Sequence, residues 1–222
     1  MEKSSEIIET VFSPRGVFKL KKNQKKYEVY AGGTLLFGTI EKISCRQLAK
    51  KTLNFHPLPE NVLIGGLGMG FTLQQVLKNP EVKQVDVIEI EPQIKKWNNQ
   101  FFSKQNGQAL NDPRTRVIIT DIIDYFKHPL RDDYDLIIID IDNGPGNTIH
   151  PDNTYLYCVE MLKIIAELLQ SRKPKGLVGI WSTTKEKWFS NRLNSIFKRT
   201  KEKLIFDPHK NSSPDYVYLA FI

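Results

Sequence analysis

The feature that most constrains the fold of this chain is an alternation, from Asn61 onward, of short apolar runs with stretches of helical composition. Strands of a parallel sheet read as such runs because they are buried on both faces, and helices must connect them. The expected strands are residues 62–64, 85–90, 116–119, 135–139, 177–180, 204–206 and 216–222. The expected helices are residues 72–77, 93–104, 122–126, 155–169 and 185–199. The pattern predicts an α/β fold with a doubly wound, mostly parallel seven-stranded sheet, which binds ligands at the carboxyl ends of its strands.

The segment before this alternation has a different pattern. Residues 17–20 and 27–30 are runs of β-forming residues separated by a charged segment, as in a hairpin, and residues 34–37 form a third run. Residues 41–53 have helical composition and end before Pro57 and Pro59. We therefore expect a small N-terminal β-rich portion, residues 1–58, followed by a larger α/β domain, residues 59–222.

The charge of the chain is distributed unevenly along its length. The formal net charge of +7 is the sum of +5 in residues 1–60, −5 in residues 61–160 and +7 in residues 161–222. A nucleic-acid-binding protein spreads its basic residues over the surface that meets phosphate. The central acidic block therefore indicates a site for a cationic ligand, and a nucleic acid, if bound, is expected only on the basic flanks.

Other simple features exclude several classes of protein. A chain with 40% hydrophobic and 26% charged residues is too apolar to be disordered. Cys45 and Cys158 are far apart and the histidines lack the spacing of metal ligands, so we expect neither a metal nor a disulfide. The first ten residues are polar, and no apolar run approaches the roughly 20 residues that span a bilayer. We expect a cytoplasmic protein without membrane contact.

A glycine-rich segment follows the first expected strand. Gly66, Gly68 and Gly70 follow the pattern GxGxG, whereas the dinucleotide fingerprint is GxGxxG, so the spacing argues against NAD. Glycines at this point let the backbone approach a ligand closely, and the next helix offers free N–H groups. The segment favours a nucleoside-type cofactor over a purely structural turn.

Acidic residues follow the next three expected strands. Glu89 and Glu91 lie roughly 20 residues after the glycines, a spacing typical of a carboxylate that binds ribose hydroxyls. Asp121 follows the third strand, and Asp140 and Asp142 follow the fourth. Each acid alone is better explained as a helix cap or a loop residue. Together they predict one acidic cleft, because the ends of neighbouring parallel strands converge.

Four segments occur in the order and spacing of a known family. They are residues 66–73 (GLGMGFTL), 87–92 (VIEIEP), 112–114 (DPR) and 139–145 (IDIDNGP). In these segments the chain resembles the spermidine synthase (polyamine aminopropyltransferase) family, over roughly residues 62–182. The resemblance implies a class I S-adenosylmethionine-dependent methyltransferase fold, which is Rossmann-like, behind a small N-terminal β domain.

The resemblance also implies roles for single residues. The three glycines flank a sulfonium nucleoside, either S-adenosylmethionine or its decarboxylated form, with Glu89 at the ribose and Asp121 at the adenine. Asp140 receives the attacking amine and accepts its proton, with Asp142 as the alternative base. The further residues expected near cofactor or substrate are Met69, Glu91, Asn143, Tyr155 and Tyr157.

Met69 is the main departure from the family, whose members usually have an aspartate at this position that binds the amine of the aminopropyl donor. Methionine cannot pair with an ammonium group. S-adenosylmethionine carries a carboxylate in the same region, which an aspartate would repel. The aminopropyl and methyl groups are therefore equal alternatives for the group transferred.

The expected activity is transfer of an alkyl group from a sulfonium nucleoside to a small amine. An alkyl amine titrates near 10.4, so a base must remove its proton, an effect worth roughly 10² to 10⁴ in rate. Two alternatives stay open: an RNA or protein methyltransferase that uses the basic residues 19–26 and 198–203, and a catalytically idle nucleoside-binding module. A homodimer is also left open.

Overall fold

The computed structural model describes residues 5–39, 42–171, 174, 176–208 and 213–222. Backbone contacts divide the chain into two compact units, Met1–Ile43 and Ser44–Ile222. The helix α1 (Lys42–Leu53) therefore belongs, from Ser44 onward, to the larger unit, and its Leu48 and Ala49 are fully buried there.

The smaller unit is a four-stranded antiparallel sheet in the order β1-β2-β3-β4. Its strands are β1 (Glu6–Ser13), β2 (Gly16–Asn23), β3 (Lys26–Ala31) and β4 (Thr34–Gly38). The expected hairpin is β2 and β3, and Leu20 and Val29 pair across it with no exposed surface. The sequence analysis did not predict β1, because this strand is buried on neither face and its alternation is weak.

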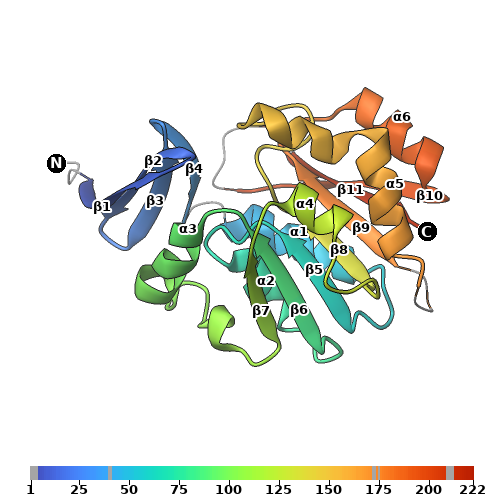
Figure 1. The fold of residues 1–222 in the computed structure, drawn as a ribbon, viewed down its shortest axis with the longest axis horizontal. Helices are drawn as coiled ribbons and strands as arrows, with labels where there is room; N and C mark the ends of the chain where they lie inside the picture. Colours follow the sequence, from blue (N-terminus) through green and yellow to red (C-terminus); the bar gives the residue numbers. More distant parts are fainter. Residues whose placement is uncertain (1–4, 40–41, 172–173, 175, 209–212) are drawn as a thin grey trace. The chain divides into compact units, whose positions relative to one another are not determined.

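The larger unit contains a seven-stranded sheet in the order β10-β11-β9-β8-β5-β6-β7, which confirms the predicted fold class (Figure 1). Strands β9, β8, β5, β6 and β7 are parallel, and β11 pairs antiparallel with β9 on one side and with β10 on the other. The strands are β5 (Asn61–Gly65), β6 (Gln84–Glu89), β7 (Thr115–Ile119), β8 (Leu136–Ile139), β9 (Leu177–Ser182), β10 (Arg199–Ile205) and β11 (Asp215–Phe221). The strand order reverses between β5 and β8, so the ligand crevice is expected at the carboxyl ends of these two strands.

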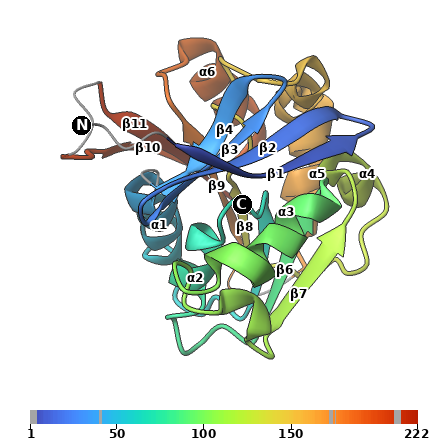
Figure 2. The same cartoon turned by 90° about the vertical axis from the view of Figure 1, so that its left-hand side faces the viewer.

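Helices cover both faces of this sheet (Figures 1 and 2). Helices α4 (Ile122–Lys127), α5 (Val159–Leu168) and α6 (Lys187–Ile196) share one apolar core with alternate residues of the central strands. The opposite face meets α1, whose Thr52 lies so close to Gly179 that a Cβ there would clash. The remaining helices are α2 (Phe71–Val76), α3 (Pro92–Trp97), the π-helix η2 (Asn98–Phe102) and the 3₁₀-helices η3 (Ala109–Asn111) and η4 (Pro151–Tyr157).

Four expected elements, three helices and one strand, differ clearly from the structure in their bounds. The helix expected at 93–104 is α3 followed by η2, and the helix expected at 155–169 starts as η4 before α5. The helix expected at 185–199 ends at Ile196, and β10 begins at Arg199 rather than at residue 204. The sequence of β10, RTKEKLI, has the lysine and glutamate content of a helix, but edge strands also carry such charges because they discourage pairing with other chains.

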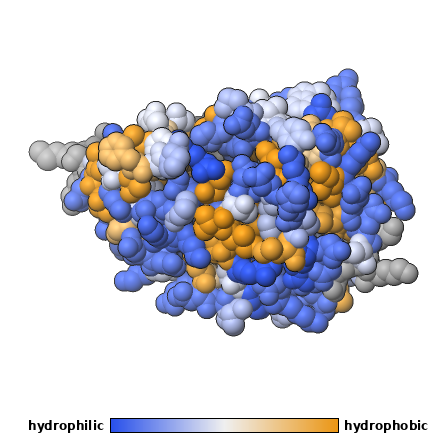
Figure 3. Space-filling view, in the orientation of Figure 1, coloured by the Kyte–Doolittle hydropathy of each residue, from blue (hydrophilic) through white to orange (hydrophobic). Residues whose placement is uncertain are grey.

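Hydrophilic residues cover most of the face seen in Figure 3, with smaller apolar areas between them. Large apolar side chains that are exposed include Phe12, Leu130 and Phe206, at 83%, 66% and 70%. Within the described part of the chain, every helix is too short or too polar to cross a membrane.

Candidate active site

A glycine turn connects β5 to α2 and forms one wall of the candidate site. Gly66 has φ of 88°, and a Cβ at this residue would lie 2.4 Å from the backbone oxygen of Asp140. The Asp140 N–H donates to the oxygen of Gly65 at 2.9 Å. A residue without a side chain is needed here because the turn lies directly against the end of β8.

Glu89, the last residue of β6, holds the glycine turn in place through hydrogen bonds to its carboxylate. Its Oε2 accepts a hydrogen bond from the Leu67 N–H at 3.1 Å, and its Oε1 accepts one from the Glu91 N–H at 2.8 Å. Glu89 is buried, and burial raises the pKa of its carboxyl group, with the backbone N–H groups of Glu91, Leu67 and Ile90 acting in the opposite direction. A carboxylate can accept about four hydrogen bonds, so Glu89 can accept from these three N–H groups and also from a ligand hydroxyl.

Two buried asparagines hold the turn from the side of η2. The Nδ2 of Asn98 donates to the Gly68 oxygen at 2.7 Å, and the Nδ2 of Asn106 donates to the Met69 oxygen at 3.2 Å. Asn106 also donates to the Oδ1 of Asn98 at 2.9 Å. The sequence analysis missed both residues; the available signal was the polar run Asn98–Gln100 inside the expected helix, where a π-helix now occurs, whereas Asn106 lies just beyond the expected helix.

Asp140 lies at the carboxyl end of β8, where α1, α2 and the sheet meet. Its Oδ2 accepts a hydrogen bond from the Thr72 hydroxyl at 2.5 Å, and the Cys45 thiol also donates to its carboxylate. Burial raises the pKa of Asp140, and the hydrogen bonds from Thr72 and Cys45 partly offset this shift. The structure thus brings the predicted base beside the glycine turn, with a hydroxyl donor and a thiol donor that the sequence analysis did not identify.

Asp142 lies two residues further along and has a different environment. Its backbone has φ of 54°, and its Oδ2 accepts a hydrogen bond from the Asn153 amide at 2.7 Å. Burial raises the pKa of Asp142, and hydrogen bonds from Asn153 and from the backbone of Ile149 and His150 oppose this. The side chain of Asp142 is therefore engaged with η4 and the loop before it, whereas Asp140 contacts the glycine-turn side of the site.

Tyr157 closes the site from η4. Its ring is buried against Phe189, and its hydroxyl donates to the oxygen of Ile141 at 3.3 Å. Burial and the nearby carboxylates of Asp142 and Asp140 raise the pKa of Tyr157. Three residues predicted separately from the sequence thus lie within electrostatic reach of one another.

The loop after Asp142 packs tightly on the end of β9. The oxygen of Asn143 accepts hydrogen bonds from the N–H and the hydroxyl of Thr183, both at 3.0 Å. A Cβ on Gly144 would lie 2.6 Å from Ser182. The position of the two aspartates is therefore fixed by contacts with the neighbouring strand.

Three other predicted site residues have structural partners of their own. Glu91 is the N-cap of α3, and Asp121 is the N-cap of α4, where its Oδ1 accepts from the Ile123 N–H at 2.7 Å. The Tyr155 hydroxyl donates to Glu160 at 2.7 Å. In the described residues, no group of three or more His, Cys, Asp or Glu side chains could hold a metal ion.

The fold and the site together define a class. A doubly wound sheet whose central strand runs into a glycine turn, with acids at the ends of the neighbouring strands, is the class I methyltransferase-like fold. The chain belongs to the spermine/spermidine synthase domain family, whose model matches residues 41–192.

Relatives with curated names are polyamine aminopropyltransferases. One from Hyperthermus butylicus is 28% identical over 76% of this chain and 58% of its own length. Another, from Saccharolobus solfataricus, is 27% identical over 86% of this chain and 62% of its own length. The match therefore spans less than two thirds of either relative.

Solved spermidine synthases share the fold. One in complex with the transition-state analogue AdoDATO has a TM-score of 0.80 and 22% identity, over 97% of this chain and 73% of that chain. The enzyme from Thermotoga maritima has a TM-score of 0.77 and 20% identity, over 97% and 72%.

Proposed function

We propose that the protein transfers an alkyl group from a sulfonium nucleoside to a small amine of the polyamine type. The observation that carries this proposal is Asp140: a partly buried carboxylate at the switch point of the sheet, beside the glycine turn and held by Thr72. Among the described residues, neither lysine nor arginine forms an ion pair with Asp140. Its charge is thus available to a cationic ligand.

The reaction follows from these groups. The sulfonium nucleoside lies over the glycine turn with its ribose hydroxyls at Glu89, and the cationic amine binds at Asp140. The amine gives its proton to the Asp140 carboxylate, its nitrogen attacks the carbon bound to sulfur, and the carbon–sulfur bond breaks to leave a neutral thioether. Positioning of the two reactants contributes most, about 7 to 11 kcal/mol, and the base contributes a further factor of roughly 10² to 10⁴.

The environment of Asp140 suits a base. A raised pKa makes the carboxylate a better proton acceptor, and the Thr72 and Cys45 donors orient the oxygen that they contact. Asp142 is the second candidate, but its Oδ2 is engaged by Asn153. We assign Asp140 as the base and Asp142, with Asn143 and Tyr157, to the shape and charge of the amine pocket.

The group transferred depends on the donor, and its identity is read from the nucleoside product. Transfer of an aminopropyl group from decarboxylated S-adenosylmethionine leaves methylthioadenosine. Methyl transfer from S-adenosylmethionine leaves S-adenosylhomocysteine. Met69, which is 3% exposed, places no charge at the turn and so leaves both donors admissible.

One experiment tests the proposal. The protein is incubated with each donor and a mixture of diamines and polyamines, and both the nucleoside and the amine products are separated by chromatography. We expect a thioether nucleoside and a modified amine from wild type, and a loss of about 10² to 10⁴ in rate for Asp140→Asn with nucleoside binding retained.

Two results separate the alternatives. Nucleoside binding without turnover, for any acceptor, indicates an idle binding module. Full activity of Asp140→Asn, together with loss of activity in Asp142→Asn, would show that Asp142 and not Asp140 is the catalytic base.

A further inference from the structure

We infer that Arg46 binds a carboxylate on the donor, so that this site takes a carboxylate-bearing sulfonium nucleoside of the S-adenosylmethionine type in preference to a decarboxylated one. The inference rests on the proposed function, because it assumes that a sulfonium nucleoside occupies the glycine turn. It concerns the part of the donor beyond the sulfur.

Arg46 lies beside the first turn of α2, directly after the glycine turn. Its guanidinium group donates to the Oε1 of Gln74 and lies 5.5 Å from the centre of the Phe71 ring. Cys45, the preceding residue of α1, accepts a hydrogen bond on its backbone oxygen from Thr72 at 3.4 Å, and its thiol contacts Asp140. Residues 45 and 46 therefore reach the junction between the donor turn and the base.

The guanidinium of Arg46 is incompletely paired. Its Nε is buried and has no hydrogen-bond partner among the described residues, and its Nη2 contacts only the neutral amide of Gln74. Burial lowers the pKa of this group, which reflects the cost of holding the cation without an anion. A ligand carboxylate would repay that cost.

Other arginines of the same chain show what the pairing of this group looks like when it is complete. Arg114, Arg116 and Arg131 each place Nε and Nη2 on the two oxygens of one carboxylate. On the same edge of Arg46, Nη2 donates to Gln74 and Nε has no hydrogen-bond partner among the described residues. This edge has the geometry that pairs with a carboxylate, and a ligand carboxylate that pairs with it has to displace Gln74, because Nη2 already contacts Gln74 and Nε has no exposed surface.

Among the described residues, no acidic side chain is recorded against Arg46. The turn and the first helical residues after it, from Met69 to Gln75, carry no charged side chain. An ammonium tail without a carboxylate would meet the positive charge of Arg46 alone on this side. A tail with both an ammonium and a carboxylate group can place the carboxylate at Arg46 and leave the ammonium directed toward the acids of the cleft.

The test is calorimetric titration of wild type and Arg46→Gln with three nucleosides: S-adenosylmethionine, decarboxylated S-adenosylmethionine and methylthioadenosine. Wild type should bind S-adenosylmethionine more tightly than the decarboxylated form. Arg46→Gln should weaken binding of S-adenosylmethionine by about 10- to 100-fold, the range for a hydrogen bond to a charged group, and should leave methylthioadenosine unchanged. Arg199→Gln, on the edge strand β10, is the matched control and should change none of the three.

A second variant tests the same point without removing the guanidinium. Gln74→Glu supplies a carboxylate to Arg46 from within the chain, so it should also weaken S-adenosylmethionine selectively while raising the melting temperature. Equal affinities of both donors for wild type, or an unchanged ratio of affinities in both variants, overturn the inference alone. If wild type fails to bind methylthioadenosine, the proposed nucleoside site itself is wrong, and the inference falls with it.

Discussion

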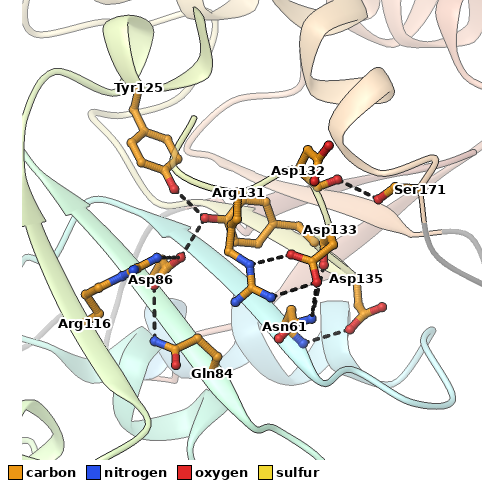
Figure 4. A network of polar contacts seen from close by, with 11 residues as sticks. Asn61, Gln84, Asp86, Arg116, Tyr125, Arg131, Asp132, Asp133, Asp135 and Ser171 are labelled. Atoms are coloured by element: carbon orange, nitrogen blue, oxygen red, sulfur yellow. Dashed lines mark hydrogen bonds and ion pairs between the residues drawn. The ribbon is translucent and has the colours of Figure 1, made fainter. Parts of the chain in front are cut away.

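Buried carboxylates have different partners at the amino ends and at the carboxyl ends of the strands of the larger sheet. At the amino ends of the strands, Asp86 has no exposed surface and is fully paired (Figure 4). It accepts hydrogen bonds from Nε and Nη2 of Arg116 at 2.8 and 2.7 Å, and from the Tyr134 hydroxyl at 2.7 Å. The Tyr134 hydroxyl in turn lies 2.5 Å from that of Tyr125.

The same end holds further compensated acids. Asp133 pairs with Arg131 and accepts from the Asn61 amide, and Asp135 accepts from the Asn61 N–H at 2.7 Å (Figure 4). These contacts join the starts of β5 and β8 and the loop before β8. Arginine neutralises Asp86 and Asp133, and Asp135 is held by a backbone N–H, so these acids take part in contacts that stabilise the fold.

At the carboxyl ends, Glu89, Asp140 and Asp142 are held by N–H groups, hydroxyls and an amide. Within the described ranges, lysine and arginine form no ion pair with these three acids, and burial raises the pKa of each. The negative charge is therefore left for a ligand. The acids of the central acidic block thus fall into two groups. Those at the amino ends of the strands include acids paired with arginine and support the fold, whereas those at the carboxyl ends have no lysine or arginine partner among the described residues and suit a cationic ligand.

The largest expected contrast comes from removing one acid at each end. Asp86→Asn should lower the free energy of unfolding by about 3 kcal/mol, because Arg116 and Tyr134 lose their shared partner; the half-exposed Arg116 keeps the effect at the lower end of the range for buried pairs. Asp140→Asn should leave the free energy of unfolding unchanged or raise it, because it removes an uncompensated buried charge. Urea titration followed by circular dichroism measures both, and equal losses in the two variants would contradict the comparison.

A second prediction concerns the donors that hold the base. Thr72→Val keeps the shape of the side chain but removes the hydrogen bond that lowers the pKa of Asp140. The pKa should rise, so the acidic limb of the rate profile, where the base becomes protonated, should move up by about one pH unit. Thr72→Ser, which keeps the hydroxyl, is the control. An unmoved limb in Thr72→Val would show that Thr72 serves packing only.

A third prediction uses the opposite pKa directions at the two ends. Burial raises the folded-state pKa of Asp140, so its protonated form favours folding; this contribution is present below the unfolded pKa near 4 and is lost as pH rises through the raised folded pKa. Stability should therefore fall across that window, and less so in Asp140→Asn. The measurement is the free energy of unfolding as a function of pH.

The smallest effect on stability is expected at the ion pair between Asp112 and Arg114, which lies just before β7. Arg114 lowers the pKa of Asp112, so this acid contributes stability above its unfolded pKa and loses it as pH falls through the folded value. Asp112→Asn should remove a dependence of opposite sign to that of Asp140, worth about 0.2 to 1 kcal/mol for a partly exposed pair. If Asp112→Asn and Asp140→Asn change the pH dependence of the free energy of unfolding in the same direction, the two acids do not have the opposite pKa shifts described here.

Much of the fold could be predicted because its signals are local. Apolar runs and the glycine spacing predicted the parallel strands and the turn after β5, which the structure and the family match confirm. The edge strand β10 was harder, because a strand with one free edge needs no apolar pattern and its lysines suit a helix equally well. The first strand, β1, was not predicted for the same reason, because it is an edge strand of the smaller sheet.

The sequence by itself determined which acids lie at strand ends, since order along the chain and the direction of parallel strands are enough to place them. Only the tertiary structure decided which of them are compensated. Glu91 and Asp121 cap helices, whereas Asp140 meets Thr72, 68 residues earlier, and the thiol of Cys45. Partners so distant in the chain leave no periodic trace in the sequence, because the free energy of a buried charge depends on what packs around it in space.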